Sequence, residues 1–562
     1  MRKIVAALLC AALLLTLPVA VFADDTPAAP EGIWTDYAAV GFAGGTGTAE
    51  DPYKIATAEQ LALLAKGTNS GNPELKYNNC YFVLTANIDL SAHRWIPIGR
   101  GTETQSFQSF DGYFNGAGHS ITGLYVDESA EQFSAGLFGN FGGHVLENLT
   151  VDGYVKTEDP GEQYDGAGIL IGCATPGHDT TITVRNCHVT GRVESDSAAG
   201  GLVGKNSYGV YENCTANVRV NGAGCAGGFI GSCFRGRLVN CTASGRVEGA
   251  YGVGGFAGVV YYECSVEKCL SETEVIASDW NAGGFVGYVE ESCKIRNCVA
   301  LGDVTSTLNY NDIHTGSFAG SLYGSEISNS HAAGTVYPTL TAGNVGGFIG
   351  LNDGTIADSS FSAEKNPELP KVGNPDSTGT EGISAVKTQE VFANICVDYY
   401  GGHDLDTSAY VTDVEPTCTE PGQKSYHCKR CGSPDSPVVI DAPGHDYGEL
   451  IARVEPTTTK TGMAAHYECA RCHKLFDEQK AERTEEELTI PRKDGQDGQG
   501  GGTIDRSPDI TTIGKDGHTS SWLGGKNDPN PPTGMAGHRS VLSVMVLAAA
   551  LVGAAALTAG KR

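Results

Sequence analysis

Basic residues are scarce in this 562-residue sequence, which contains 38 lysines and arginines against 66 aspartates and glutamates. The formal net charge of −28 opposes contact with the phosphates of DNA and RNA and with anionic membrane surfaces. We therefore expect no nucleic-acid partner. The motif His-Glu-x-x-His is also absent, which excludes the zinc site that metalloproteases build on one helix.

Helical periodicity is missing from the long central part of the chain, where glycine is abundant instead. The chain contains 76 glycines, about twice the average share. A short apolar motif flanked by glycines recurs with 27 to 33 residues between successive copies, and a repeat of this length is typical of a solenoid. The copies end at Gly139, Gly172, Gly204, Gly231, Gly258, Gly287, Gly320 and Gly350.

A second motif follows the first and carries a cysteine at a fixed position. From that cysteine onward, apolar or small residues alternate with polar ones, which is the period of a half-buried β-strand. One such strand per repeat, always with the same inward-facing set, predicts a parallel β-helix whose coils stack about 4.8 Å apart. A propeller is the alternative, although its blades need four strands in about 40–50 residues. The cysteines are Cys187, Cys214, Cys241, Cys269 and Cys298.

The five cysteines could be free thiols or disulfides, and both states fit their fixed position in the repeat. Their inward parity predicts a ladder of buried free thiols that act as small apolar groups. Disulfides between neighbouring coils are the alternative, because the Cα separation between coils permits them. No copy is paired with a matching histidine, so we expect no catalytic cysteine. Four further cysteines of this region stay unassigned: Cys225, Cys233, Cys264 and Cys293.

Three arginines share one outward-facing repeat position, namely Arg192, Arg219 and Arg246. A row of like charges costs energy unless anions balance it. We expect either a solvated row paired with nearby acids or a small patch that binds anionic groups of a glycan or wall polymer.

A short helix is predicted ahead of the repeats. Thr57 and Gln60 have the spacing of a capping box, and Leu61, Leu64 and Ala65 then lie on one helix face. Such a helix would cover the open end of the solenoid and its unpaired strand edges.

Two tandem units of about 40 residues follow the solenoid, and each contains a Gly-His pair and a Cys-x-x-Cys motif. Zinc requires four ligands arranged as a tetrahedron. The pairs Cys428/Cys431 and Cys469/Cys472 are 37 residues apart, too far for one ribbon, so we expect one site per unit.

In the first unit, we expect Cys418 to supply a third thiolate and His445 or His403 to complete the set. The second unit has Thr458 in place of that cysteine, which leaves its cysteine pair with His466 or His473. We predict structural zinc; disulfides or a decayed structural repeat are the alternatives.

Both ends of the chain carry targeting patterns. Residues 1–23 combine a basic start, an apolar stretch and small residues before Asp24, as secretory signal peptides do. Residues 541–559 are apolar and uncharged, and basic residues flank them, which predicts one transmembrane helix with a cytoplasmic tail at 560–562. Residues 493–540 are rich in Gly, Asp and Lys and predict a disordered, flexible tether.

Several of these patterns resemble known families. The "GLFG" and "GLVG" cores, with "GTAEDPYKIATAEQLALLA" upstream, resemble the GLUG motif of bacterial surface proteins over roughly residues 44–362. This resemblance implies a β-helical fold and a cell-surface location, without a defined reaction. The Cys-x-x-Cys units resemble zinc-ribbon-like repeats of secreted surface proteins.

The stretch "NPPTGMAGHRS", which precedes the apolar segment, resembles a Gram-positive sorting signal. The resemblance implies that a sortase cuts between Thr533 and Gly534 and joins Thr533 to the wall. The family pattern begins with Leu where Asn530 stands, and a plain membrane anchor is the alternative.

We thus expect a mainly β protein whose function is non-enzymatic: an adhesin or stalk on a Gram-positive cell surface that binds a glycan, host matrix or another surface protein. An extracellular polysaccharide lyase or glycoside hydrolase is the alternative, since parallel β-helices also carry such enzymes. The expected parts are a signal peptide (1–23), the opening segment and cap (24–135), GLUG-type repeats (136–365), an exit cap or linker (366–400), two zinc-ribbon-like repeats (401–445 and 446–492), a tether (493–540), a transmembrane helix (541–559) and a basic tail (560–562).

Overall fold

The computed structural model describes residues 26–72, 77–100, 108–129, 134–158, 166–176, 181–307, 313–338, 343–377 and 379–493. The predicted signal peptide, the transmembrane segment and the sorting site at Thr533 and Gly534 lie outside these residues. Within the described ranges, no helix is both long and apolar enough to cross a bilayer.

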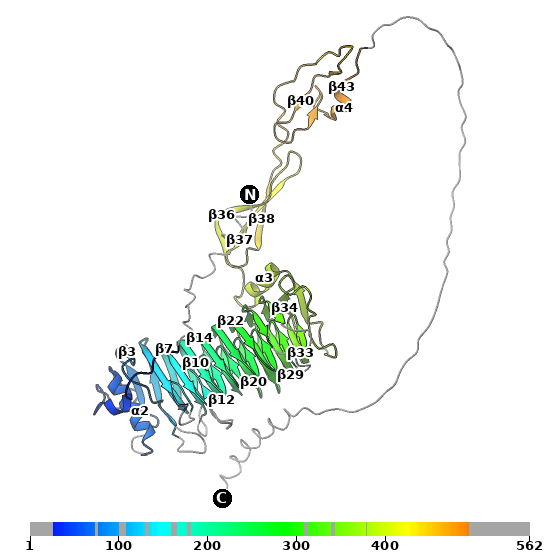
Figure 1. Ribbon diagram of the computed structural model, residues 1–562. Helices are drawn as coiled ribbons and strands as arrows, with labels where there is room; N and C mark the ends of the chain where they lie inside the picture. The colour runs from blue at the N-terminus through cyan, green and yellow to red at the C-terminus, as the bar shows by residue number, and fades with distance from the viewer. Residues whose placement is uncertain are drawn as a thin grey trace, which may run out of the picture. The chain divides into compact units, whose positions relative to one another are not determined.

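The central part of the chain is a parallel β-solenoid, in which each coil pairs with the coils before and after it (Figure 1). Thr215 pairs with Thr242, and Val220 with Val247, one coil further along. All pairings between the solenoid strands described are parallel, which confirms the predicted β-helix and makes the propeller alternative wrong.

Each full coil contributes strands to four stacked columns. The first column is a separate sheet: β8 (Gly166–Ala167), β11 (Ala198–Gly200), β15 (Ala226–Gly227), β19 (Gly252–Gly254), β23 (Asn281–Gly283), β28 (His314–Gly316) and β32 (Asn344–Gly346). The second is β6 (Phe138–Phe141), β9 (Ile171–Ala174), β12 (Val203–Ser207), β16 (Ile230–Phe234), β20 (Ala257–Tyr261), β24 (Val286–Glu290), β29 (Ala319–Ser328) and β33 (Ile349–Ala357).

The third column is β1 (Tyr53–Ile55), β2 (Tyr81–Leu84), β4 (Tyr113–Asn115), β13 (Val210–Glu212), β17 (Arg237–Val239), β21 (Ser265–Glu267) and β25 (Lys294–Arg296). The C-terminal parts of β29 and β33 continue this third column. The long strands β7 (Val145–Thr157) and β10 (Thr183–Ser195) run through the third and fourth columns. The fourth is completed by β3 (Ile88–Asp89), β5 (Ser120–Asp127), β14 (Thr215–Gly222), β18 (Thr242–Gly249), β22 (Leu270–Ala277), β26 (Val299–Ala300), β27 (Val304–Ser306), β30 (His331–Ala332), β31 (Val336–Pro338), β34 (Ser359–Ser362) and β35 (Ile383–Val386).

Identical side chains stack in the core from coil to coil. Successive phenyl rings are 4.8 to 5.1 Å apart between centroids, and their planes agree within 8°. The glycines beside them allow this close packing: a Cβ on Gly227 would collide with the carbonyl oxygen of Ile230 and lie 2.7 Å from the nitrogen of Gly258 in the next coil. The stacked rings belong to Phe229, Phe256, Phe285, Phe318 and Phe348.

The Asn-Cys corner has a backbone cause. Asn213 and Asn240 adopt φ angles of 55° and 53°, a left-handed conformation that asparagine tolerates better than most residues. Their side chains also hydrogen-bond from coil to coil, with Asn240 Nδ2 donating to Asn213 Oδ1 at 2.7 Å. Asparagine thus suits this corner, although Lys268 adopts the same conformation, with a φ of 52°, at the equivalent position of another coil.

The five ladder cysteines are fully buried and free, as the inward parity predicts. Each thiol donates to the backbone carbonyl two residues earlier at 3.2 to 3.4 Å. Cys233, Cys264 and Cys293 are also buried, and the sulfurs of Cys233 and Cys264 lie 3.7 Å apart. These three form a second set of thiols that the repeat pattern does not predict.

The predicted capping helix is α2 (Ala58–Asn69), which follows the short 3-10 helix η1 (Trp34–Tyr37) at the N-terminal end of the solenoid (Figure 1). Thr57 Oγ1 accepts from the amide of Gln60, and Gln60 Oε1 accepts from the amide of Ala56 at 2.8 Å. Leu61, Leu64 and Ala65 are fully buried. The Thr57 half of the capping box and the buried face are confirmed, whereas Gln60 caps the amide of Ala56, one residue before the N-cap Thr57.

Helix α3 (Thr388–Asp398) packs on the outer face of the last coils. Val391 and Ile395 contact Val299 and Ala333 in one apolar cluster. The buried ring of His331 lies 2.8 Å from Asp398 through Nε2 and 2.9 Å from Ser360 through Nδ1. The helix is thus fixed to the solenoid by both apolar and polar contacts.

The residues that follow are β-rich, as predicted. The first module is an antiparallel sheet of β36 (Leu405–Val414), β37 (Gly422–Cys428) and β38 (Pro434–Ile440). A second small sheet contains β40 (Tyr467–Glu468), β41 (Leu475–Phe476) and β42 (Glu482–Arg483). Strands β39 (Gly462–Met463) and β43 (Thr489–Ile490) pair in a separate unit, and the short helix α4 spans Glu485–Leu488.

Candidate metal centres and a groove on the solenoid

Two clusters of three cysteines and one histidine lie within the described residues. In each cluster, all four ligand atoms are within 4.8 Å of one another. The first cluster is Cys396, His403, Cys428 and Cys431; the second is Cys418, His445, Cys469 and Cys472.

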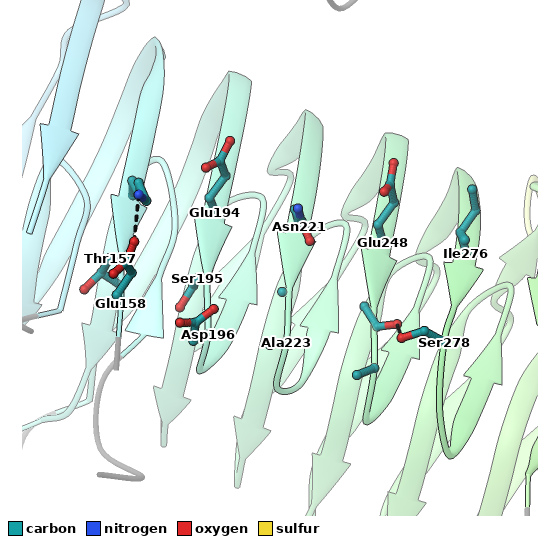
Figure 2. A pocket seen from close by; sticks show the side chains of 14 residues that line it. Thr157, Glu158, Glu194, Ser195, Asp196, Asn221, Ala223, Glu248, Ile276 and Ser278 are labelled. Atoms are coloured by element: carbon teal, nitrogen blue, oxygen red, sulfur yellow. Dashed lines mark hydrogen bonds and ion pairs between the residues drawn. The ribbon is translucent and has the colours of Figure 1, made fainter. Parts of the chain in front are cut away.

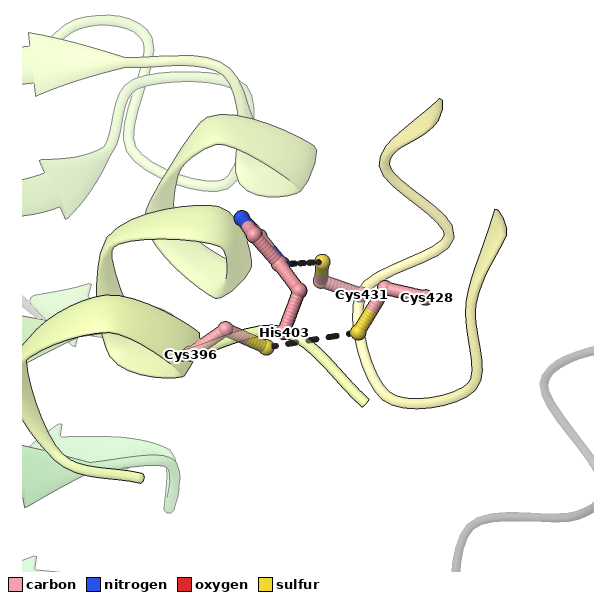
Figure 3. A group of neighbouring side chains, drawn as sticks. All are labelled: Cys396, His403, Cys428 and Cys431. Atoms are coloured by element: carbon pink, nitrogen blue, oxygen red, sulfur yellow. Dashed lines mark hydrogen bonds between the residues drawn. The ribbon is translucent and has the colours of Figure 1, made fainter. Parts of the chain in front are cut away.

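The first cluster is assembled from a helix, a short connection and a turn. Cys396 comes from the last turn of α3, His403 from the connection that leads to β36, and the Cys428/Cys431 pair from the turn after β37 (Figure 3). The Sγ atoms of Cys396 and Cys428 are 3.8 Å apart, and Cys431 Sγ lies 3.3 Å from His403 Nδ1. The four side chains converge on one point.

These distances match a tetrahedral zinc site. With Zn–S bonds of about 2.3 Å and Zn–N bonds of about 2.0 Å, a tetrahedron has S–S edges of about 3.8 Å and S–N edges of about 3.5 Å. The second cluster agrees as well: the Sγ atoms of Cys418 and Cys469 are 3.7 Å apart, and Cys472 Sγ lies 3.5 Å from His445 Nδ1. All of these cysteines are free. The residues present therefore fit zinc.

The electrostatics of the Cys-x-x-Cys turns favour thiolates. Burial raises the pKa of Cys428, but the backbone N–H groups of Cys431 and Arg430 and the ring of His403 outweigh it and lower that pKa to about 6. The corresponding amides of Cys472 and Arg471, with His445, lower the pKa of Cys469 to about 5 in the same way. Thiolates are the form in which cysteine binds a metal.

The grouping of the ligands differs from the sequence-based expectation. All six predicted ligands belong to a cluster, but Cys418 joins the second Cys-x-x-Cys pair instead of the first. His403 completes the first cluster and His445 the second, so neither His466 nor His473 is a ligand in either cluster. The sequence does carry one signal for this pairing: a Gly-His-Asp precedes each Cys-x-x-Cys by a similar interval. Cys396, a single cysteine on a helix, carries no such signal.

A groove of about 400 Å³ crosses five successive coils, from β7 to β22, at the end of the fourth column (Figure 2). Glu194, Asn221 and Glu248 occupy one register position on successive strands. Glu158, Asp196 and Ser278 add further oxygens to the lining. The groove thus offers carboxylate, amide and hydroxyl groups at intervals of one coil.

An aromatic pair lies in the turns that border this groove. Tyr251 directly follows Ala250, and Trp280 comes two residues after Ser278; Ala250 and Ser278 both line the groove. The two rings stack with centroids 5.6 Å apart, and Tyr251 is 47% exposed. Nothing in the sequence predicted this pair, because the turns vary from repeat to repeat.

The predicted row of arginines is present and in register. Arg192 pairs with Arg219, and Arg219 with Arg246, on neighbouring coils. Carboxylates balance the row: Arg192 Nε lies 2.6 Å from Glu194, and the two other arginines lie 3.2 and 2.7 Å from Glu248. This pairing favours the balanced row over an anion-binding patch, and the anion patch stays a prediction.

Comparisons with known proteins agree with the repeat. The model of the GLUG motif matches residues 195–221 and 278–305. A protein of Evansella cellulosilytica named as a Gly-rich membrane protein is 33% identical over 142 residues, which cover 24% of this chain and 14% of that protein. Halomucin of Haloquadratum walsbyi is 34% identical over 170 residues, 28% of this chain and 2% of halomucin.

The chain therefore spans only a small part of the length of these relatives. A solved structure of a Bacteroides ovatus protein assigned as an immunoglobulin A1 protease aligns with a TM-score of 0.37 at 20% identity, over 63% of this chain and 90% of that one. The chain carries the GLUG motif on a parallel β-solenoid.

Proposed function

We propose that this protein is a non-enzymatic surface protein of a Gram-positive bacterium, anchored by its C-terminus, whose solenoid binds a glycan. The observation that carries this proposal is the groove with its adjoining aromatic pair. Sugars present hydroxyl groups that hydrogen-bond to carboxylates and amides, and apolar faces that stack on aromatic rings. Tyr251 and Trp280 supply such a face, and Glu194, Asn221 and Glu248 supply the polar partners.

The charge of the groove selects among glycans. Lys156 and the three arginines balance Glu158, Glu194 and Glu248. The net charge of −28 opposes an acidic polymer, so the expected ligand is neutral or cationic. The GLUG match and the names of the two relatives, a membrane protein and a halomucin, support a location at the cell surface. A wall or membrane anchor would present the groove to glycans or matrix proteins outside the cell.

The test is binding of the whole protein to arrays of glycans and matrix proteins. The double variant Tyr251→Ala/Trp280→Ala should bind the captured glycan at least tenfold more weakly. Tyr337→Ala is the matched control, since Tyr337 is also exposed (49%) but, unlike Tyr251 and Trp280, is not within two residues of any residue that lines the groove, and it should bind as the unchanged protein does. Equal binding by the double variant would refute the proposed role of the groove.

A carbohydrate-active enzyme remains the second candidate, because one pair of carboxylates has a suggestive spacing. Glu194 and Glu248 lie two coils apart in register, or about 9.6 Å at 4.8 Å per coil, near the upper end of the separation used by inverting glycosidases. Both carboxylates are engaged by arginines, so we expect no turnover. Release of reducing ends or unsaturated products from any bound glycan would establish the enzyme instead.

We also propose that both Cys₃His clusters hold zinc as a structural ion. Four protein ligands close the coordination shell and leave no position for a substrate or a reactive water. Native mass spectrometry of the whole protein should find two zinc ions per chain, and a mass without bound metal at neutral pH would overturn this assignment.

A further inference from the structure

The two metal clusters share an unusual arrangement: neither takes all its ligands from one module. The first cluster combines Cys396 of α3 with His403, Cys428 and Cys431 of the first module. The second combines Cys418, in the loop between β36 and β37 of that first module, with His445, Cys469 and Cys472 of the second module, which begins at His445 and contains the sheet β40–β42. In each cluster, one cysteine comes from the part of the chain that precedes the module.

Cys396 lies on a helix that is fixed to the solenoid on both sides of it. Val391 and Ile395 pack on the solenoid, and Asp398, two residues after Cys396, pairs with the buried His331. Asn394 donates to Ser360 Oγ at 3.2 Å from the same helix. Because both ends of this last turn contact the solenoid, the position of Cys396 Sγ is set by the solenoid and not by the first module.

Cys418 is held in a comparable way by the first module. The turn from Thr417 to Glu420 closes with a backbone hydrogen bond of 3.0 Å and a bond from the Glu420 amide to Thr417 Oγ1 of 2.9 Å. The side chain of Cys418 packs with Cys469 and Phe476 in one small buried cluster. The loop is preorganised in one module while its thiol lies among the ligands of the next.

We propose that each metal ion fastens one module to the part of the chain before it: the first ion joins the first module to the solenoid through Cys396, and the second ion joins the second module to the first through Cys418. This inference rests on the zinc occupancy proposed above. Part of the binding free energy of each ion then orders the two joined parts, as expected when metal binding and folding are coupled. Removal of metal would leave short connecting segments, such as Tyr399–Gly402, and the contact of Cys418 with Phe476 to hold the parts together.

The proposal can be tested because it expects a substitution in one part of the chain to change hydrogen exchange in the module that follows. Backbone amides in each Cys-x-x-Cys turn report on its own cluster: Lys429 N–H donates to Asp404 at 2.7 Å, and Ala470 N–H donates to Asp446 at 2.8 Å. Hydrogen exchange of residues 429–432 therefore reports on the first ion, and exchange of residues 470–473 on the second. The variants are Cys396→Ser and Cys418→Ser in the whole protein, with Cys80→Ser as a control in a free cysteine of neither cluster.

Each cluster variant should lose one of two zinc ions when challenged with a competing chelator, corresponding to a loss of affinity of at least tenfold. In Cys418→Ser, exchange should speed up at 470–473, in the next module, and stay unchanged at 429–432. In Cys396→Ser, exchange should speed up at 429–432 and stay unchanged at 470–473. Cys80→Ser should keep both ions and both exchange rates.

The outcomes separate the two proposals. If the unchanged protein holds no zinc, both the zinc assignment and the linking role fail. If it holds two ions but Cys418→Ser speeds exchange at 429–432, the sites belong to single modules, so the linking role fails while zinc stands. If Cys396→Ser keeps two ions and unchanged exchange, the junction with the solenoid is refuted.

Discussion

The stack of phenylalanines gives the sharpest test of how this solenoid is held together. Phe285 lies in the middle of five rings, 4.8 Å from Phe256 and 5.1 Å from Phe318, and it is fully buried. Replacement of a buried Phe by Ala costs about 3–5 kcal/mol when the surroundings cannot collapse. Backbone pairing fixes the neighbouring coils, so Phe285→Ala should fall in the upper half of that range.

The end of the stack provides an internal comparison. Phe348 has one stacked ring, Phe318, among the described residues, so Phe348→Ala should cost less by about one aromatic pair, or 0.5–1.5 kcal/mol. Phe285→Leu preserves most of the volume and should cost under about 1.5 kcal/mol. Urea unfolding followed by far-ultraviolet circular dichroism measures all three. Equal costs for the two alanine variants, or a cost below about 1 kcal/mol for Phe285→Ala, would refute the stacking argument.

Three smaller changes test the remaining features. Cys241→Ser should cost about 1 kcal/mol or less in urea unfolding, because its hydroxyl can donate to the Val239 carbonyl as the thiol does; a loss above 3 kcal/mol would show that the thiol has another role. Asn213→Gly should be nearly neutral and Asn213→Ala should cost about 1 kcal/mol in the same assay, because only the alanine resists a φ of 55°; the reverse order would contradict the corner argument. Burial lowers the pKa of His331, although Asp398 raises it. The unfolded state therefore binds the proton more readily, and the docking of α3 should weaken as pH falls through about 6.5. Hydrogen exchange of α3, corrected for intrinsic rates, should speed up over this pH range in the unchanged protein and should not do so in His331→Gln.

The sequence predicts those parts of the fold that repeat and those that are local. The alternation of apolar and polar residues around Cys187 and its equivalents identifies the inward face of the strands. Ser330 occupies the same repeat position in the next coil, and its hydroxyl accepts from the amide of Cys298 at 3.2 Å. The capping box at Thr57 involves neighbours only three residues apart. The repeat of the cysteines and the capping box can both be recognised in the sequence, because each depends only on the spacing of residues along the chain.

Long-range pairings are less accessible from the sequence. Cys418 lies 51 residues from the thiol of Cys469 that it approaches, and a tandem repeat invites the assumption that each copy is self-sufficient. The aromatic pair beside the groove depends on two turns that are not copies of one another. Its position follows from the stacking of the coils, which brings Tyr251 and Trp280 together although neither belongs to the repeat motif.

Cysteine thus has two chemically distinct roles in this chain, as a buried apolar group and as a candidate metal ligand, and the surroundings of each thiol decide which role it has. In the solenoid, burial raises the pKa of Cys241 and Cys269, and their thiols bond to carbonyls, which keeps them protonated and inert. In the modules, backbone amides directed at Cys428 outweigh burial and lower its pKa to about 6. Cys428 and Cys469 of the Cys-x-x-Cys turns are therefore the thiols that an approaching metal ion meets as thiolates, whereas Cys241 and Cys269 contribute packing. The proposed metal sites and the packed thiols of the solenoid thus differ in the groups that face each sulfur: backbone amides at Cys428, and backbone carbonyls at Cys241 and Cys269.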